Sequence, residues 1–134
     1  MHCVGTAVTS RGVVTVLKRH KLSVRIVAVE PAESSVLRGG PAGPHKIEGV
    51  GIGYTPPLWD PTLVDDILPV KTDDAKEMSR RLAREEALFA GTSSGANVVA
   101  AIRVAQQLGL GATVVTLMVD SGLKYLNTDV YRSR

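Results

Sequence analysis

The chain has 134 residues, of which 44% are hydrophobic and 22% are charged, with a formal net charge of +3. This length suits one domain, and the composition is that of soluble globular proteins, so a packed core is expected and a disordered chain is excluded. The longest apolar run, around 114–119, is far shorter than the roughly 20 residues of a membrane span, and the amino terminus lacks the order of a secretory signal. We therefore expect a cytoplasmic protein with no membrane partner.

Charge and cysteine content argue against two further classes of function. The positive residues are scattered and have few aromatic neighbours that could stack on bases, so nucleic acid is not an expected partner. The basic cluster from Lys18 to Lys21 falls where a helix should end, and basic residues there complement the helix dipole. Cys3 is the single cysteine and the three histidines lack ligand spacing, so neither a disulfide nor a metal site is predicted.

The first half of the chain opens on a strand-to-helix unit. Residues 2–4 form a short strand that leads into a small-residue turn at 5–12, and a helix is expected over 13–20. Residues 24–29 are almost continuously apolar and β-branched, which predicts a strand covered on both faces that ends near Pro31. The glycine- and proline-rich stretch 34–65 is predicted as a long loop whose apolar tail packs on the domain.

A short strand at 66–70 is followed by a predicted amphipathic helix of about four turns. Thr72 is expected to cap this helix, and the acidic residues at 73 and 74 suit the positive end of its dipole. The apolar stripe of the helix is expected to belong to the core. Its members are Ala75, Met78, Leu82 and Phe89.

A second small-residue turn at 91–95 precedes another predicted helix at 96–108, which Gly109 and Gly111 end. Its expected buried stripe consists of Val98, Ile102 and Ala105. Residues 113–119 are predicted as a further buried strand, and an ordered polar loop follows. These repeated strand, turn and helix units predict a three-layer α/β/α sandwich around a mostly parallel sheet.

The turns at 5–12 and 91–95 are the candidate binding sites. Each delivers a helix amino terminus, free backbone N–H groups and small hydroxyl side chains, which together bind anions. Ligands of open α/β sheets bind at the carboxyl ends of the strands, so both turns are expected to face one crevice. No nucleotide fingerprint is present, and no histidine is placed to activate Ser93 or Ser94. The residues themselves leave two readings open, a small anionic ligand or simple helix capping.

Four segments carry motifs in a characteristic order. They are Val29–Ser34 (VEPAES), Gly43–Gly53 (GPHKIEGVGIG), Gly91–Ala96 (GTSSGA) and Asp120–Asp129 (DSGLKYLNTD). Their order and spacing resemble the cysteine synthase (O-acetylserine sulfhydrylase) family, which are pyridoxal-phosphate enzymes of the tryptophan synthase β-like superfamily. The similarity runs from about Val4 to Tyr131. It implies that residues 1–134 are the carboxy-terminal part of the large cofactor-binding domain, an α/β fold incomplete relative to the two-domain fold of the family.

The resemblance implies a role for the first turn. Gly5, Thr6, Ala7, Val8 and Thr9 match the family's G-T-G-G-T loop, and they are thereby implied to hold the phosphate of pyridoxal 5′-phosphate. Two glycines of that loop are replaced here. If either position needs a positive φ, the alanine or the valine carries strain.

Further positions are implied in the same way. Ser93 matches the serine that hydrogen-bonds the pyridine nitrogen of the cofactor. The glycine-rich segment at the substrate entrance is matched by Gly49, Gly51 and Gly53. Asp120 and Ser121 match a motif near the cofactor ring.

Two motifs of the family do not occur in this sequence. The Schiff-base lysine belongs to an S-x-K-D-R-like segment, and the substrate carboxylate is held by a T-S-G-N-T-like loop. None of the six lysines lies in such a context, and Lys46 is expected to be the nearest of them to the site. No catalytic residue is therefore assigned, and the cofactor is expected to bind without a covalent bond.

The implied parent reaction is β-replacement of O-acetylserine by sulfide, which gives L-cysteine. We expect a truncated chain that is inactive alone and that forms a homodimer or associates with a complementary amino-terminal part. The Gly-Pro-His-Lys-Ile stretch at 43–47 favours cysteine synthase over the dehydratase relatives. The alternative is a non-catalytic phosphate-ligand-binding or regulatory module that pairs with a full-length homologue.

Overall fold

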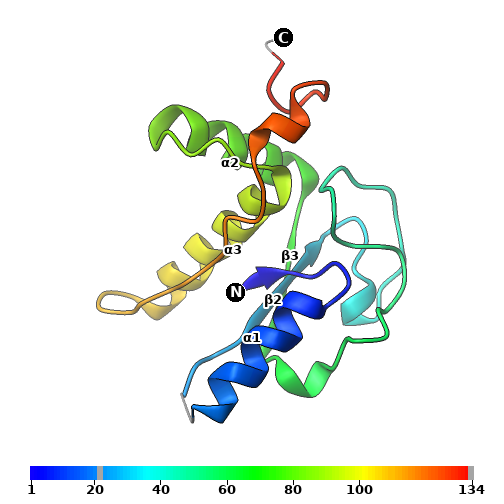
Figure 1. The fold of residues 1–134 in the computed structure, drawn as a ribbon, viewed down its shortest axis with the longest axis vertical. Helices are drawn as coiled ribbons and strands as arrows, with labels where there is room; N and C mark the ends of the chain where they lie inside the picture. Colours follow the sequence, from blue (N-terminus) through cyan, green and yellow to red (C-terminus); the bar gives the residue numbers. More distant parts are fainter. Residues whose placement is uncertain (21–22, 133–134) are drawn as a thin grey trace.

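The computed structural model describes residues 1–20 and 23–132, and it has an α/β fold (Figure 1). Its sheet has three parallel strands in the order β1-β2-β3. These strands are β1 (His2–Cys3), β2 (Val27–Pro31) and β3 (Asp66–Val70). The three predicted strands of the first seventy residues are confirmed, although the second lies slightly later in the chain than its apolar run. Of the basic cluster, Lys21 lies outside the described residues.

The two prolines of the sheet occupy positions that cost no ladder hydrogen bond. Pro69 lies in β3, which is an edge strand, and pairs in register with Glu30. Proline lacks an N–H group and is tolerated at an edge for that reason. Pro31 is the last residue of β2, in agreement with the expected end of that strand.

Three α-helices accompany the sheet in the described part of the chain. They are α1 (Val8–Arg19), α2 (Thr72–Glu85) and α3 (Thr92–Leu108). The first and third begin earlier than predicted, because each small-residue turn is itself the first turn of its helix. None of the described helices is both long and apolar enough to cross a membrane.

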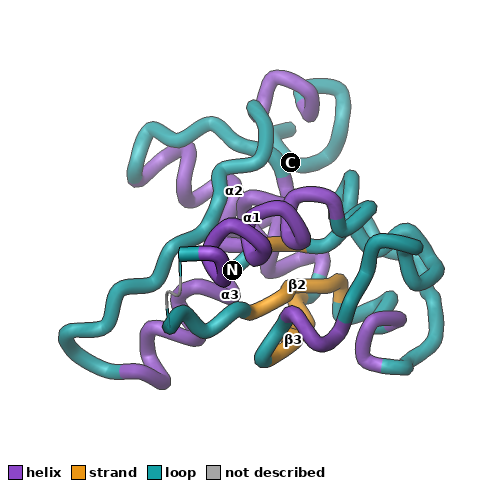
Figure 2. The backbone as a smooth tube through the Cα atoms, turned by 60° about the horizontal axis from the view of Figure 1, so that its bottom comes forward, coloured by secondary structure: helices purple, strands orange, loops and turns teal. Residues whose placement is uncertain are grey.

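Two apolar clusters lie against the two faces of the sheet, whose strands are orange in Figure 2. On one face, Cys3, Val29 and Val70 pack against α2 and α3. On the other face, a cluster of Val4, Ala7 and Ala28 is covered by Leu37 and Trp59 from the long loop. This arrangement confirms that the apolar tail of the loop packs on the domain, and that the sheet is covered on both sides.

The contact between α2 and α3 is closer than ordinary side chains allow. A Cβ atom at Gly95 would overlap the carbonyl oxygen of Ala75 and the hydroxyl of Ser79, so only glycine fits at this position. The buried stripe of α3 is therefore Ala96, Ala100 and Val104. The predicted stripe was wrong, and Ile102 is 41% exposed. The reason is that the small residues of α3, rather than its large ones, face the neighbouring helix.

The ends of α2 also differ from the prediction. Thr72 is the first helical residue rather than the cap, which is Lys71. The chain leaves the helix after Glu85 because Ala87 has a left-handed φ of 55° and the N–H of Leu88 returns to the carbonyl of Leu82 at 2.9 Å. Phe89 is consequently outside the helix and 38% exposed, not part of its buried stripe.

Residues 113–119 do not form the predicted buried strand. They lie along the free edge of β1, where the amino group of Met1 donates to the carbonyl of Val115 at 2.8 Å. The side chain of Asn97 donates to the carbonyl of Leu117 at 3.0 Å. Because β1 has only two residues, it offers too few backbone groups for a regular ladder of hydrogen bonds. The terminal amino group and a side chain donate to carbonyls of this segment instead. Val115 is 69% exposed as a result.

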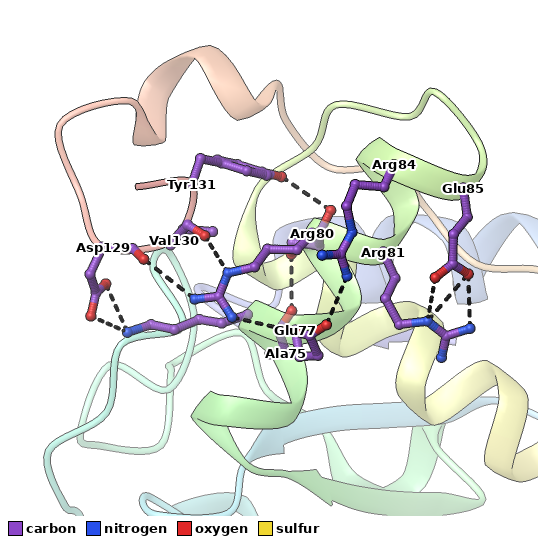
Figure 3. A network of polar contacts seen from close by, with 11 residues as sticks. Ala75, Glu77, Arg80, Arg81, Arg84, Glu85, Asp129, Val130 and Tyr131 are labelled. Atoms are coloured by element: carbon purple, nitrogen blue, oxygen red, sulfur yellow. Dashed lines mark hydrogen bonds and ion pairs between the residues drawn. The ribbon is translucent and has the colours of Figure 1, made fainter. Parts of the chain in front are cut away.

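The carboxy-terminal segment folds back over α2 (Figure 3). The ammonium of Lys76 donates to both carboxylate oxygens of Asp129 at 2.8 Å, and Nε of Arg80 donates to the carbonyl of Val130 at 2.6 Å. The Tyr131 ring lies 4.6 Å from that of Phe89. The Lys76 side chain is only 8% exposed, because the carboxy-terminal segment covers it. The sequence pattern predicts this charged residue outside the apolar stripe of the helix.

The ion pair between Lys76 and Asp129 predicts a pH dependence of stability. The hydrogen bond from Lys76 lowers the pKa of Asp129 below its ordinary value of 3.8. The pair therefore stabilises the fold above pH 3.8, and this contribution is lost as the pH falls through the lowered pKa of the folded state. We expect Asp129→Asn to lower the melting temperature at neutral pH and to reduce its decline in acid, as measured by circular dichroism.

Glu86→Gln is the matched control for this experiment. It removes a carboxylate at the end of α2 that forms no ion pair within the described part of the chain. The control should keep the acid dependence of the unaltered protein. An identical acid profile for Asp129→Asn would contradict the assignment.

Candidate functional site

The first turn of the site connects β1 to α1. A Cβ atom at Gly5 would overlap the carbonyl oxygen of Gly49, so the two backbones approach each other as closely as glycine permits. Ala7 is the N-cap of α1 and has a left-handed φ of 66°. The first turn of the helix contains no acidic residue. Its free N–H groups and the positive end of the helix dipole therefore present an uncompensated site for an anion.

Of the two residues that replace glycines of the family's loop, only Ala7 has a left-handed backbone conformation. Strain falls on Ala7, because a residue with a Cβ pays roughly 1–2 kcal/mol in this region. Val8 is already helical and carries no such strain. The turn thus keeps a backbone conformation suited to glycine, although alanine occupies the position.

The second turn is the amino terminus of α3, where three hydroxyl residues follow Gly91. The hydroxyl of Thr92 accepts from the N–H of Glu48 at 3.3 Å, and that of Ser94 accepts from the N–H of Val119 at 2.8 Å. Both of these side chains therefore tie neighbouring segments to the helix. Ser93 differs from them because it lines the pocket described next.

The two turns face one polar pocket of about 360 Å³. It is lined by residues of the first turn (Gly5, Thr6, Ala7, Val8 and Thr9) together with Ser93, Asp120 and Tyr125. Gly49 and its neighbours Glu48 and Val50 also line it. The volume lies within the usual range of small-molecule sites, about 300–1,000 Å³. The expectation of a shared crevice at the carboxyl ends of the strands is confirmed.

Three of the candidate site residues lie elsewhere. Gly51 and Gly53 line a separate cavity of about 10 Å³ behind the first turn, next to the buried side chain of Glu30. At Gly51, φ is 59° and a Cβ atom would lie 2.6 Å from Cγ of Pro31. The hydroxyl of Ser121 accepts from the N–H of Leu123 at 3.3 Å and does not line the pocket. Of the three matched glycines, only Gly49 therefore borders the pocket.

The lysine at the pocket is not the one expected. Lys124 lines it, with its ammonium 3.9 Å from Oδ2 of Asp120. The expectation for Lys46 is wrong, because that side chain is directed to Asp129 at 3.7 Å. No spacing signal in the sequence marks Lys124, because η3 (Gly122–Tyr125) is a single turn whose direction depends on its packing.

Two residues of β1 also border the pocket and were not predicted as part of it. Burial lowers the pKa of His2, which favours the neutral imidazole. Burial raises the pKa of Cys3 to about 12, so its thiol stays protonated and unreactive at neutral pH. The Cys3 thiol lies 3.6 Å from the carbonyl of Ser93. These side chains line the pocket and bring no nucleophile to it.

Fold and pocket together define a class of protein, a parallel α/β domain with a polar pocket at the amino termini of two helices. The family model described as pyridoxal-phosphate dependent enzyme matches residues 1–120. The chain therefore belongs to the family of pyridoxal-phosphate dependent enzymes.

Its relatives include cysteine synthases. The cysteine synthase of Staphylococcus aureus is 48% identical over 128 residues, which are 96% of this chain and 41% of that protein. Cysteine synthase 3 of Caenorhabditis elegans is 46% identical over 129 residues, 96% of this chain and 38% of that protein. The crystal structure of O-acetyl serine sulfhydrylase isoform 3 from Entamoeba histolytica superposes with a TM-score of 0.92 at 41% identity, and covers 98% of this chain.

The chain spans about two fifths of the length of these relatives. The sheet and helices described above correspond to that share of a cysteine synthase-type fold. The residues of the first turn fit the phosphate of the family's cofactor, since they line the pocket and α1 has no acidic residue in its first turn to repel an anion.

The contact between Gly5 and Gly49 predicts a strong effect of one methyl group. Gly5→Ala places a Cβ atom against backbone, which cannot move aside as a side chain can. We expect the free energy of unfolding to fall by about 1–3 kcal/mol in urea denaturation, as for other overpacked sites.

Gly12→Ala is the matched control. Gly12 lies within α1, and no heavy atom is within 4 Å of its added Cβ. The substitution should raise the free energy of unfolding by about 0.5–1 kcal/mol, because alanine is the better helix former. Equal changes in the two variants would show that the Gly5–Gly49 approach is not a steric constraint.

Proposed function

We propose that this chain binds pyridoxal 5′-phosphate without a covalent bond and forms the cofactor-binding part of a cysteine synthase-type enzyme. In this proposal residues 1–134 correspond to the carboxy-terminal part of the large domain. One observation carries it: a single pocket joins the anion-binding turn at Gly5–Thr9 to the hydroxyl of Ser93. A phosphate at one end and a ring nitrogen at the other match these two groups of donors in type and order.

Each part of the pocket has a defined task in this proposal. The backbone N–H groups at the start of α1 and the hydroxyls of Thr6 and Thr9 bind the phosphate. Ser93 hydrogen-bonds the ring nitrogen, and as a neutral group it does not impose a charge there. Bound pyridoxal phosphate supplies an electron sink for bond cleavage at the α-carbon of an amino acid.

The proposed reaction of the whole enzyme is replacement of the acetoxy group of O-acetylserine by sulfide, which releases acetate and forms L-cysteine. It requires a lysine in a Schiff-base segment, and these 134 residues contain none in such a context. The lysine that lines the pocket, Lys124, lies beside Asp120. We infer that the chain is inactive alone and that activity depends on a polypeptide that supplies the lysine and the substrate-carboxylate loop, within a homodimer or a complex with that part.

The missing lysine context also supports a second candidate function. In that case the chain is a non-catalytic module that keeps the phosphate-ligand site and pairs with a full-length homologue. Mixing the chain with an amino-terminal fragment of a cysteine synthase that carries the lysine and the substrate-carboxylate loop separates the two. Neither piece forms cysteine alone, so restored cysteine formation supports the first function. No restoration, together with stable association with a full-length cysteine synthase, favours the module.

Ser93→Ala tests the ring end of the site. Pyridoxine 5′-phosphate is the suitable probe, because it has no aldehyde and cannot react with surface lysines. We expect its affinity to fall severalfold in isothermal titration, while the affinity for inorganic phosphate is unchanged. If Ser93 only caps α3, the variant loses about 1 kcal/mol of stability and keeps its affinity.

Thr15→Ala serves as the control for this measurement. Its hydroxyl bonds the carbonyl of Arg11 at 2.7 Å within α1 and does not line the pocket. Both probes should bind this variant as they bind the unaltered chain.

The lack of a Schiff-base lysine is tested with pyridoxal 5′-phosphate itself. After borohydride reduction and peptide mapping, we expect only weak labelling spread over exposed lysines. Stoichiometric labelling of one lysine would refute the statement that this chain has no covalent anchor. Lys124→Arg identifies that residue if Lys124 is the one labelled.

A further inference from the structure

Tyr125 is a buried aromatic residue at the pocket whose hydroxyl is directed to a carboxylate. It lies in η3 and is only 3% exposed. The hydroxyl donates to Oδ2 of Asp120 at 2.7 Å. Burial, and next the hydrogen bond to Asp120, raise the pKa of Tyr125, so its hydroxyl remains a donor at neutral pH. Both residues line the pocket that the first turn also lines.

The other oxygen of Asp120 has a different environment. Oδ1 is buried and finds no hydrogen-bond partner among the described residues. It approaches Gly91 so closely that a Cβ atom there would overlap it. Gly91 is the N-cap of α3 and has no side chain to compensate the helix dipole. The Asp120 carboxylate therefore supplies negative charge to this helix from outside, which α1 lacks at its own amino terminus.

Backbone contacts join the two segments around this carboxylate. The N–H of Gly91 donates to the carbonyl of Asp120 at 3.3 Å, and the N–H of Gly122 donates to the carbonyl of Phe89 at 3.0 Å. Ala90 and Ser121 form an antiparallel bridge. The position of Ser93 at the pocket is thus coupled to the segment that carries Asp120, and the side chain of Tyr125 locks the Asp120 carboxylate in place.

We propose that Tyr125 is a positioning residue of the site: through Asp120 it holds the amino terminus of α3, and with it Ser93, at a fixed place opposite the Gly5–Thr9 turn. This inference rests on the proposed function. Tyr125 touches no reacting group in this role. Its hydroxyl acts on the ring end of the site only, so the phosphate end is independent of it.

The role predicts a selective effect of Tyr125→Phe. The variant loses one hydroxyl, so Oδ2 of Asp120 loses this donor, whereas Oδ1 has no partner among the described residues in either case. Loss of this charge-assisted hydrogen bond releases the ring end of the site, so the affinity for pyridoxine 5′-phosphate should fall about tenfold. The affinity for inorganic phosphate should not change. Isothermal titration of the full chain measures both.

Tyr131→Phe is the matched control. Tyr131 also uses its hydroxyl within the fold, bonding the carbonyl of Ala90, but it does not line the pocket. Its loss should lower the melting temperature and leave both affinities unchanged. Equal losses of pyridoxine 5′-phosphate affinity in the two tyrosine variants would show a general structural role and overturn the inference.

Substitutions of Asp120 give a second test that does not depend on the folding of Tyr125→Phe. Asp120→Asn keeps an acceptor for the Tyr125 hydroxyl and should retain most of the affinity, whereas Asp120→Ala should lose as much as Tyr125→Phe. In the double variant Tyr125→Phe/Asp120→Ala the losses should not add, because both remove one interaction. Additive losses, or equal losses for Asn and Ala at position 120, would contradict the proposal.

The two probes separate this inference from the function on which it rests. If the unaltered chain binds neither probe, the proposed function fails and this inference fails with it. If it binds inorganic phosphate alone, the ring end of the proposed site is refuted, together with the role of Tyr125. If it binds both probes and Tyr125→Phe behaves as the unaltered chain, only the inference about Tyr125 is overturned.

Discussion

The close backbone approach of Gly5 to Gly49 is the constraint on which the site depends. It brings the glycine-rich loop against the end of β1, and the N–H of Gly51 then reaches the carbonyl of Val4 at 3.2 Å. The loop consequently closes one side of the pocket at the point where the first turn begins. A side chain at Gly5 would separate the two backbones and open the pocket, whatever residues remained to line it.

The two helix amino termini at this pocket are electrostatically different. The start of α1 has no acidic residue, whereas the start of α3 lies beside the Asp120 carboxylate. The first turn is therefore the more favourable of the two for an anion. Ala7 belongs to the first turn, where its backbone adopts a left-handed conformation that is unfavourable for a residue with a Cβ atom.

The carboxy-terminal segment connects the site to the rest of the fold. Asp120 and Tyr125 lie at the pocket, while a few residues later Asp129 pairs with Lys76 on α2. In turn, α2 packs closely on α3 at Gly95, which lies in the second turn. The contact of the carboxy-terminal segment with α2 and the position of Ser93 on α3 are therefore linked.

Local patterns in the amino-acid sequence were enough for the strand at 66–70, the order of the elements, the two small-residue turns and the family, because each depends on neighbouring residues or a compact motif. Packing decided the rest. Residues 113–119 have the composition of a strand, yet β1 is too short to pair with them. The stripe of α3 and the burial of Lys76 depend on which surface lies opposite. Tyr125 belongs to the pocket only because η3 turns it toward Asp120, a contact that no spacing along the chain encodes.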